Sequence, residues 1–495
     1  MKIYSLLPLL FALLLLPEVL PAQEVKMSSS QRIRDKAYYP KVLGKFMDHY
    51  FVVRTSRQRR KTVVLEKYDK NLRLVASKSY RLKGKHNLEK IFMVQDKIVL
   101  FYSEKNNREY NVKLKAHIYN KSLTPDKQGV EVSVMPNMDM RGANFYIYRS
   151  KTRSELIISH FDSGADKDDA FVFKVVDKNL KARYKNTHQL ETKGYPEIRE
   201  LIYYQNAVFA LYREDVSSKK KNPVYFYSLL KINTKSSSQQ IYSLFYEDTK
   251  VIQGKITLDA VNEQFLFAGF YTSKETSLLE GTAFLSTSIH QDTFFYDYLP
   301  FSGAQIEQLM GRNFKGRGIK NFLNQELIAT SDGGVMLFNE FYNVEEEVFS
   351  TMTSFGMPQS YVRRYYHYND LFILSIDSDA NEDWYDIVRK DQTTINDNGY
   401  YSSFVPMVQK ESIALFYNSF SRRNPSLLKY ELTSHGGGEK QVLRELNNLD
   451  GKVIPQESLQ VSDHEIVFPG YERNNRNFVL VKITFEKSYP EMVEE

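Results

Sequence analysis

The stretch from 377 to 383 comes closer than other parts of the chain to the residue pattern of a metal site. Its oxygen-bearing side chains occupy alternate positions, namely Asp377, Asp379, Asn381 and Asp383. Oxygen ligands at this spacing open the calcium-binding loop of an EF-hand. That loop also needs a glycine at its sixth position and an acid at its twelfth, where this chain has Glu382 and Val388. The same residues suit a hairpin turn, so Ca²⁺ is the one cofactor that the sequence suggests.

Patterns that would support catalysis are weak. The nine histidines are scattered without zinc-binding spacing, and no cysteine is present to act as a nucleophile. No Gly-x-Ser-x-Gly elbow nominates a serine, although a catalytic triad can assemble from residues far apart in sequence. A pair of carboxylates that cleaves glycosidic bonds could likewise come from distant parts of the chain. The sequence nominates no catalytic residue and favours a non-catalytic protein, with an enzyme as the alternative.

A candidate partner-binding group consists of Arg363, Arg364, Tyr365 and Tyr366. Arginine and tyrosine are among the residue types that most often anchor protein–protein interfaces. The alternative is that the two tyrosines only begin a strand that leads to Asp370.

The elements that would position these residues are short β-strands that recur along the chain. Three apolar runs, within 63–72, 117–123 and 173–180, each end in an Asp/Asn-x-Asn/Ser-Leu turn, and weaker copies follow. The eight anchor positions are 69, 120, 177, 233, 290, 377, 431 and 484. Six of the intervals are 51 to 57 residues long, and the interval from 290 to 377 is 87. A long period made of short strands indicates a repeat architecture.

Each repeat contains about three predicted strands, too few to bury both faces of a sheet. Copies that stack around an axis solve this problem, so we expect an all-β protein, a β-propeller of seven to eight blades. A single propeller domain is expected over 24–495, with a partly helical insertion at 304–364 whose helical part falls within 304–322. We also expect Tyr38 to Leu43 to complete the sheet of the last repeat, because this would remove an exposed edge.

The stretch from Ser331 to Tyr342, a turn followed by a central strand, carries a resemblance. With the repeat pattern, it is similar to uncharacterised secreted β-propeller-like repeat proteins of Gram-negative bacteria. An outer-membrane β-barrel is the alternative fold, since it would also be exported, rich in tyrosine and phenylalanine, and free of cysteine. Short strands interrupted by Lys67, Lys174 and Lys231 argue against it.

Residues 1–23 have the composition of a secretory signal peptide. Lys2 precedes an apolar run from Ile3 to Leu16, which is too short to span a bilayer comfortably. The absence of cysteine excludes a bacterial lipid anchor, and no later segment resembles a transmembrane helix. The net charge of +7 is spread over interspersed acids and bases, which disfavours nucleic acid as a partner. We expect an exported protein, periplasmic or peripheral to the outer membrane, and possibly exposed at the cell surface.

Two functions follow from these observations. The first is a non-catalytic scaffold that binds a protein of the cell envelope, as an accessory component of an outer-membrane transport or secretion complex. The alternative is a secreted or periplasmic polysaccharide hydrolase or lyase with its site in the central funnel of the propeller.

Overall fold

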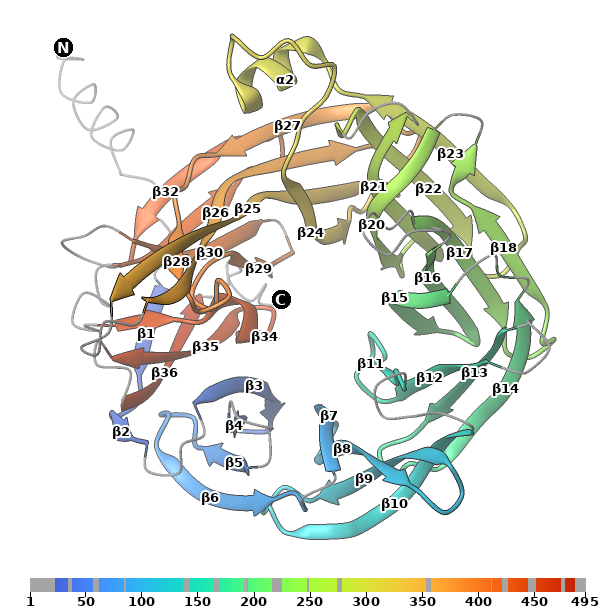
Figure 1. Cartoon of the computed structure of the whole chain (residues 1–495), viewed down its shortest axis with the longest axis vertical. Helices are drawn as coiled ribbons and strands as arrows, with labels where there is room; N and C mark the ends of the chain where they lie inside the picture. Colours follow the sequence, from blue (N-terminus) through green and yellow to red (C-terminus); the bar gives the residue numbers. More distant parts are fainter. Residues whose placement is uncertain are drawn as a thin grey trace, which may run out of the picture.

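Eight small antiparallel sheets, or blades, stand side by side in a ring (Figure 1). The chain is described by a computed structural model at residues 23–33, 38–56, 62–83, 86–136, 143–163, 169–190, 192, 195–215, 225–246, 249–273, 278–352, 358–410, 412–420, 426–443, 451–472 and 477–485. The predicted signal peptide falls outside these residues apart from Gln23. The expected β-propeller is confirmed, with one blade for each of the eight repeats. No single closed sheet joins the described strands.

The first four blades follow one another along the chain, with four strands each. Blade 1 contains β3 (Tyr39–Phe46), β4 (His49–Thr55), β5 (Thr62–Tyr68) and β6 (Leu74–Arg81). Blade 2 contains β7 (His86–Val94), β8 (Lys97–Asn106), β9 (Asn111–Tyr119) and β10 (Pro125–Pro136). Blade 3 contains β11 (Tyr146–Arg149), β12 (Leu156–Ser163), β13 (Asp169–Val176) and β14 (Ala182–Leu190). Blade 4 contains β15 (Tyr195–Tyr204), β16 (Ala207–Asp215), β17 (Tyr225–Asn233) and β18 (Gln239–Ser243).

The remaining blades vary this plan. Blade 5 contains β19 (Phe245–Tyr246), β20 (Thr249–Asp259), β21 (Gln264–Ser273), β22 (Gly281–Ser288) and β23 (Phe294–Pro300). Blade 6 contains β24 (Phe322–Ala329), β25 (Val335–Met352), β26 (Pro358–Ile376), β27 (Glu382–Val388) and β28 (Thr393–Ile395). Blade 7 contains β29 (Phe404–Val408), β30 (Ile413–Ser419), β31 (Ser426–Leu432) and β32 (Gly438–Val442). Blade 8 contains β33 (Gly451–Val453), β34 (Leu459–Ser462), β35 (Glu465–Glu472) and β36 (Asn477–Phe485), joined by β1 (Gln23–Met27) and β2 (Gln31–Arg32).

The outermost strand is the one that the sequence pattern did not show. In Figure 1 each blade runs from an inner strand near the axis to an outer strand at the rim. The middle strands are almost wholly buried, as in β4 and β8, whereas β6 and β32 are mostly exposed. Because exposed outer strands need no apolar alternation, they read as polar turns in the sequence. Each repeat therefore holds about four strands, not three.

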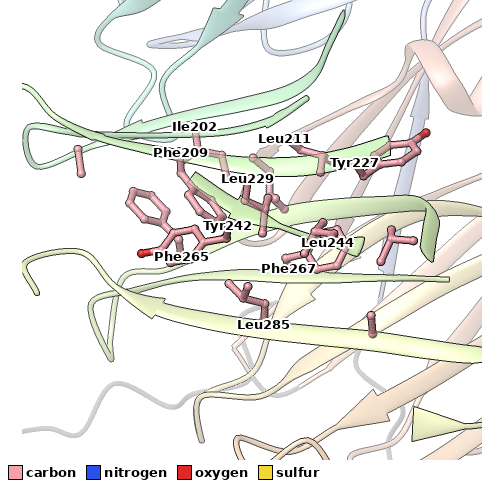
Figure 2. Close-up of a cluster of buried hydrophobic side chains, with 14 of the residues drawn as sticks. Ile202, Phe209, Leu211, Tyr227, Leu229, Tyr242, Leu244, Phe265, Phe267 and Leu285 are labelled. Atoms are coloured by element: carbon pink, nitrogen blue, oxygen red, sulfur yellow. The ribbon is translucent and has the colours of Figure 1, made fainter. Parts of the chain in front are cut away.

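The core lies between the blades. Eight clusters of buried apolar side chains occupy the eight interfaces between neighbouring blades. Figure 2 shows the cluster between blades 4 and 5, in which Phe209 and Phe265 stack with ring centroids 4.8 Å apart. Since each blade buries both faces against its neighbours, the ring is stabilised by its closure.

The recurring Asp/Asn turns join the third and fourth strands of a blade. In blade 3, Oδ1 of Asp177 accepts hydrogen bonds from the amides of Asn179 and Lys181, both at 2.9 Å. Leu180 follows with a φ of 64°, an uncommon conformation for a residue with a side chain. Its side chain packs into the cluster between blades 2 and 3. The motif is thus structural, because it closes a hairpin and presents a leucine to the preceding blade.

Replacing Asp177 with alanine should remove both hydrogen bonds to the turn and lower the free energy of unfolding by about 1 kcal/mol. The Asp177→Asn variant should lose less, because Asn120 already performs this task in blade 2. Denaturant unfolding measures both. Equal stability of the alanine variant and the wild type would contradict the assigned role.

A strand from before the first blade completes the last blade, as expected, but the prediction that Tyr38 to Leu43 forms this strand is wrong. Tyr39–Phe46 is the innermost strand of blade 1, and the outer strand of blade 8 is β1, at Gln23–Met27. Its residues pair with β36, from Gln23 opposite Phe485 to Met27 opposite Val481. β1 therefore lies at the rim of the ring, and β3, which follows in the chain after β2, lies near the axis. In β3, Val42 packs into the cluster between blades 1 and 8, and Leu43 packs into the cluster between blades 1 and 2. The sequence alone does not show whether such a strand is an inner or an outer one.

The insertion at 304–364 contains one helix and a long hairpin. The helix α2 spans Gly303–Met310 and begins with a capping box between Ser302 and Gln305. It is the only α-helix among the described residues, which agrees with the expected short helix. The second part of the insertion is an extension of β25 and β26.

Candidate functional site

The extended hairpin of blade 6 projects beyond the rest of its sheet. β24 pairs with β25 only as far as Phe341, whereas β25 and β26 remain paired up to Met352 and Pro358. Figure 1 shows the two strands continuing together past β24. We call residues 343–352 and 358–364 the arm. Between Asn343 and Met352, the edge of β25 that faces away from β26 has no paired neighbour among the described residues.

One face of the arm carries exposed apolar side chains among polar ones. Val348 lies opposite Val362, and the period of two along a strand places Val344 and Met352 on the same face. The exposed fractions of Val344, Val348, Met352 and Val362 are 37, 67, 75 and 45%. An ion pair between Glu346 and Arg364, with a distance of 2.6 Å, crosses the strands among them.

The other face carries an aromatic stack. The rings of Phe349 and Tyr361 stack with centroids 5.2 Å apart, and the guanidinium of Arg363 lies 4.6 Å from the Phe349 centroid. The hydroxyl of Tyr365 donates to Glu347 at 2.9 Å. These contacts stiffen a two-stranded ribbon that would otherwise be marginal in water.

The four residues predicted to bind a partner thus divide into two groups. Arg363, Arg364 and Tyr365 lie on the arm or at its base. Tyr366 is only 8% exposed and donates to Oδ1 of Asn398 at 2.7 Å, so it helps to hold the arm in place. The sequence interpretation missed the face with exposed apolar side chains, because Val344, Val348 and Met352 are spaced four residues apart and the segment between them shows no period-two alternation.

A buried ion pair anchors the base of the arm. Lys390 donates to the carboxylate of Glu340, to the carbonyl oxygen of Tyr368 at 3.1 Å and to Gln392 at 2.8 Å. Ser403 donates to the other oxygen of Glu340 at 2.6 Å. The side chains of Lys390 and Glu340 are 1 and 0% exposed. The network fixes β25 and β26 to the connection between blades 6 and 7.

The predicted calcium ligands form a hairpin turn. Oδ1 of Asp377 accepts from the amides of Asp379 and Asn381, at 2.9 and 2.7 Å. Asp383 lies in β27, where its nearest hydrogen-bonding partner is Ser375 at 3.4 Å. In the part of the chain that the structure describes, no three acidic or histidine side chains come together as a metal site. Calcium binding here stays a prediction, with Asp377 already engaged by its own turn.

A wide depression lies beside this turn, between the turns of blades 5, 6 and 7. It encloses about 920 Å³ and includes Trp384, Asp259 and Asp332 in its lining. Asp259 accepts from the amides of Val261 and Asn262, and Asp332 accepts from Gly334. The carboxylates of both aspartates therefore hold turns.

The inner strands place a second set of charges near the axis. Lys255 of β20 forms a 2.7 Å ion pair with Glu200 of β15. The side chain of Glu326 in β24 is exposed to solvent. Protein atoms around it still remove part of its hydration, which raises the pKa of its carboxyl, and the charges of Lys255 and Lys151 oppose this rise. One carboxyl with a raised pKa thus lies on the inner wall, and the predicted polysaccharide-cleaving site would need a second group.

Comparisons with known proteins find weak structural similarities and no family. No protein-family model and no curated protein matches the chain. The solved polysaccharide lyase Uly1 has 8% identity and a TM-score of 0.41, covering 92% of this chain and 91% of that one. The propeller domain of the Trilobed protease from Pyrococcus furiosus has 10% identity and a TM-score of 0.37, covering 82 and 98%. The WD40 domain of SCAP from fission yeast has 9% identity and a TM-score of 0.29, covering 94 and 98%. The likeness is one of fold.

Within the described residues, no helix has the length and apolar character needed to cross a lipid bilayer.

Proposed function

We propose that this protein is an exported, non-catalytic β-propeller that binds another protein of the bacterial cell envelope through the arm. The ring serves as a rigid base, and the arm presents the binding surface. The partner contributes an extended segment with apolar side chains that adds as a strand to the edge of β25 that faces away from β26. Such a role suits an accessory component of an outer-membrane transport or secretion complex.

The exposed apolar face of the arm carries this proposal. Val348, Met352 and Val362 are each at least 45% exposed, on a ribbon that lies outside the eight interface clusters. Scattered apolar residues on a surface are ordinary, but several on one face of a projecting element mark a contact site. Arg363 and Tyr361 on the opposite face are residue types enriched at interfaces.

The free edge of β25 supports strand addition as the binding mode. On the edge away from β26, its main-chain groups between Asn343 and Met352 face no strand among the described residues, and natural proteins rarely leave a long edge of this kind uncovered. An added strand would satisfy these groups, while its alternate side chains would meet Val344, Val348 and Met352.

Export is supported by the position of β1. The predicted signal peptide, 1–23, ends where the closing strand begins, because β1 starts at Gln23. Removal of the signal peptide near Glu24 would keep most of the pairing between β1 and β36. The ring could therefore close in the exported chain.

Charges on the apolar face should abolish partner binding without unfolding the ring. We expect the double variant Val348→Glu/Val362→Glu to lose at least about 30-fold in affinity, since a true anchor contributes about 2 kcal/mol or more. Val261→Glu is the matched control, because Val261 is 79% exposed on a turn of blade 5. Affinity purification from the native envelope, followed by titration of the recovered protein, measures the loss. Recovery of the same partner by the arm variant at wild-type yield would contradict the proposal. Recovery of the wild-type protein only as a free monomer would contradict it too.

A second candidate function, cleavage of a polysaccharide in the centre of the ring, is favoured by Glu326 alone. A carboxyl with a raised pKa is suited to donate a proton to a leaving group. Its test is release of new chain ends from neutral and acidic polysaccharides, compared between the wild type and Glu326→Gln. Equal release by both proteins, or none by either, would exclude Glu326 as the proton donor.

A further inference from the structure

Two arginines near the axis carry charges that no described carboxylate neutralises. Arg149 ends β11, the innermost strand of blade 3, and Arg153 lies in the turn that follows. Nη1 of Arg149 donates to the carbonyl oxygens of Met93 and Leu43, at 3.1 and 3.5 Å. Nη2 of Arg153 donates to the carbonyl oxygen of Gln460 at 3.2 Å. Both guanidinium groups therefore contact uncharged main-chain atoms.

These contacts bring the guanidinium groups to the centre of the ring. Leu43 and Met93 belong to β3 and β7, the innermost strands of blades 1 and 2, and Gln460 belongs to β34 of blade 8. Figure 1 shows β11 and β34 on either side of the centre. Arg153 thus spans from blade 3 to blade 8.

The surroundings disfavour two positive charges at this place. Arg149 is half-buried, and burial, followed by the charge of Arg153, lowers the pKa of Arg149 to about 10. Arg153 is exposed to solvent, although the protein atoms around it still lower its pKa. Lys90, on the inner strand of blade 2, has a pKa lowered by burial and by Lys41. Cations that are partly desolvated beside other cations are costly unless an anion completes the group. Such groups often belong to binding sites.

The chemistry of the two side chains defines the ligand. A guanidinium presents a planar fork of N–H donors that matches the oxygens of a carboxylate, phosphate or sulfate. The carbonyl contacts use one terminal nitrogen of each arginine, which leaves other donors for a ligand. We propose that Arg149 and Arg153 form a binding site for an oxyanion group of a ligand at the centre of the ring. Lys151, an exposed residue of the same turn, interacts instead with the carboxyl of Glu326.

The experiment titrates the full-length exported chain with sodium phosphate, sodium sulfate and sodium glucuronate in separate runs. Sodium chloride keeps the ionic strength constant, so that screening alone produces no difference. The wild type should bind at least one of these anions saturably and melt at a higher temperature in its presence. Arg149→Gln and Arg153→Gln should each weaken the affinity by about tenfold or more. Arg183→Gln is the matched control in blade 3, because Arg183 already pairs with Glu155 at 2.7 Å, and it should bind as the wild type does.

A purely structural role of the arginines gives a different result. In that case the variants would melt at lower temperatures, but the wild type would show no binding heat and no anion-dependent shift, which would overturn the proposal. Wild-type affinity in both glutamine variants would overturn it too. If a glutamine variant does not fold, Arg153→Lys keeps the charge and loses the fork, and its weaker binding would support the site. Binding of glucuronate alone would indicate an acidic sugar, and binding of phosphate or sulfate would indicate a tetrahedral ester.

Discussion

The Lys390→Ala variant is expected to lose about 3–5 kcal/mol in free energy of unfolding, because it leaves the Glu340 carboxylate buried without its cation. Both side chains are almost completely shielded from water, and burial lowers the pKa of Lys390 while Glu340 opposes this. Thermal and denaturant unfolding of the purified protein measure the change.

The double variant Glu340→Gln/Lys390→Met is the control for this prediction. It removes both charges, keeps an amide that can accept from Ser403, and fills most of the volume of the lysine stem. We expect it to be clearly more stable than Lys390→Ala. A loss below about 0.5 kcal/mol for Lys390→Ala would show that the pair contributes no more than a surface contact.

Removal of residues 23–32 is expected to destabilise the ring by at least about 4 kcal/mol and to make it associate. The truncation takes away the ladder from Gln23 to Met27, and the Ser28 hydroxyl that accepts from the amide of Leu480 at 2.9 Å. Each lost main-chain hydrogen bond costs about 1 kcal/mol, and Val25 also leaves the cluster between blades 7 and 8. The edge of β36 then becomes a template for another chain.

Melting curves and size-exclusion chromatography at several protein concentrations measure the two effects of this truncation. A synthetic peptide of residues 23–32 should restore the melting temperature in proportion to its concentration, because it supplies the missing strand in trans. Ser28→Ala, which removes only one side-chain contact, should have a much smaller effect. An unchanged melting curve of the truncated chain would mean that β1 does not close the ring.

The repeating strands and turns were predictable because their causes are local. Asp177 bonds to amides two and four residues away, and the apolar runs before it are short and regular. The count of eight repeats followed from these turns, and the short helix at Gly303–Met310 followed from its own apolar face. The four candidate calcium ligands came from a local pattern of the same kind. Asp377 holds a turn with its side chain, and calcium binding there stays a prediction.

The tertiary structure alone decided which distant segments meet. β1 pairs with β36 more than 450 residues away, and no local pattern selects that edge over the inner position that Tyr39–Phe46 occupies. Arg153 meets Gln460 only because the ring closes, so neither residue stands out in the sequence. The arm is a further case of this kind. Val344, Val348 and Met352 recur every four residues, which is not the pattern of a strand. Their exposure depends on β24 ending its pairing at Phe341, which only the assembled sheet determines.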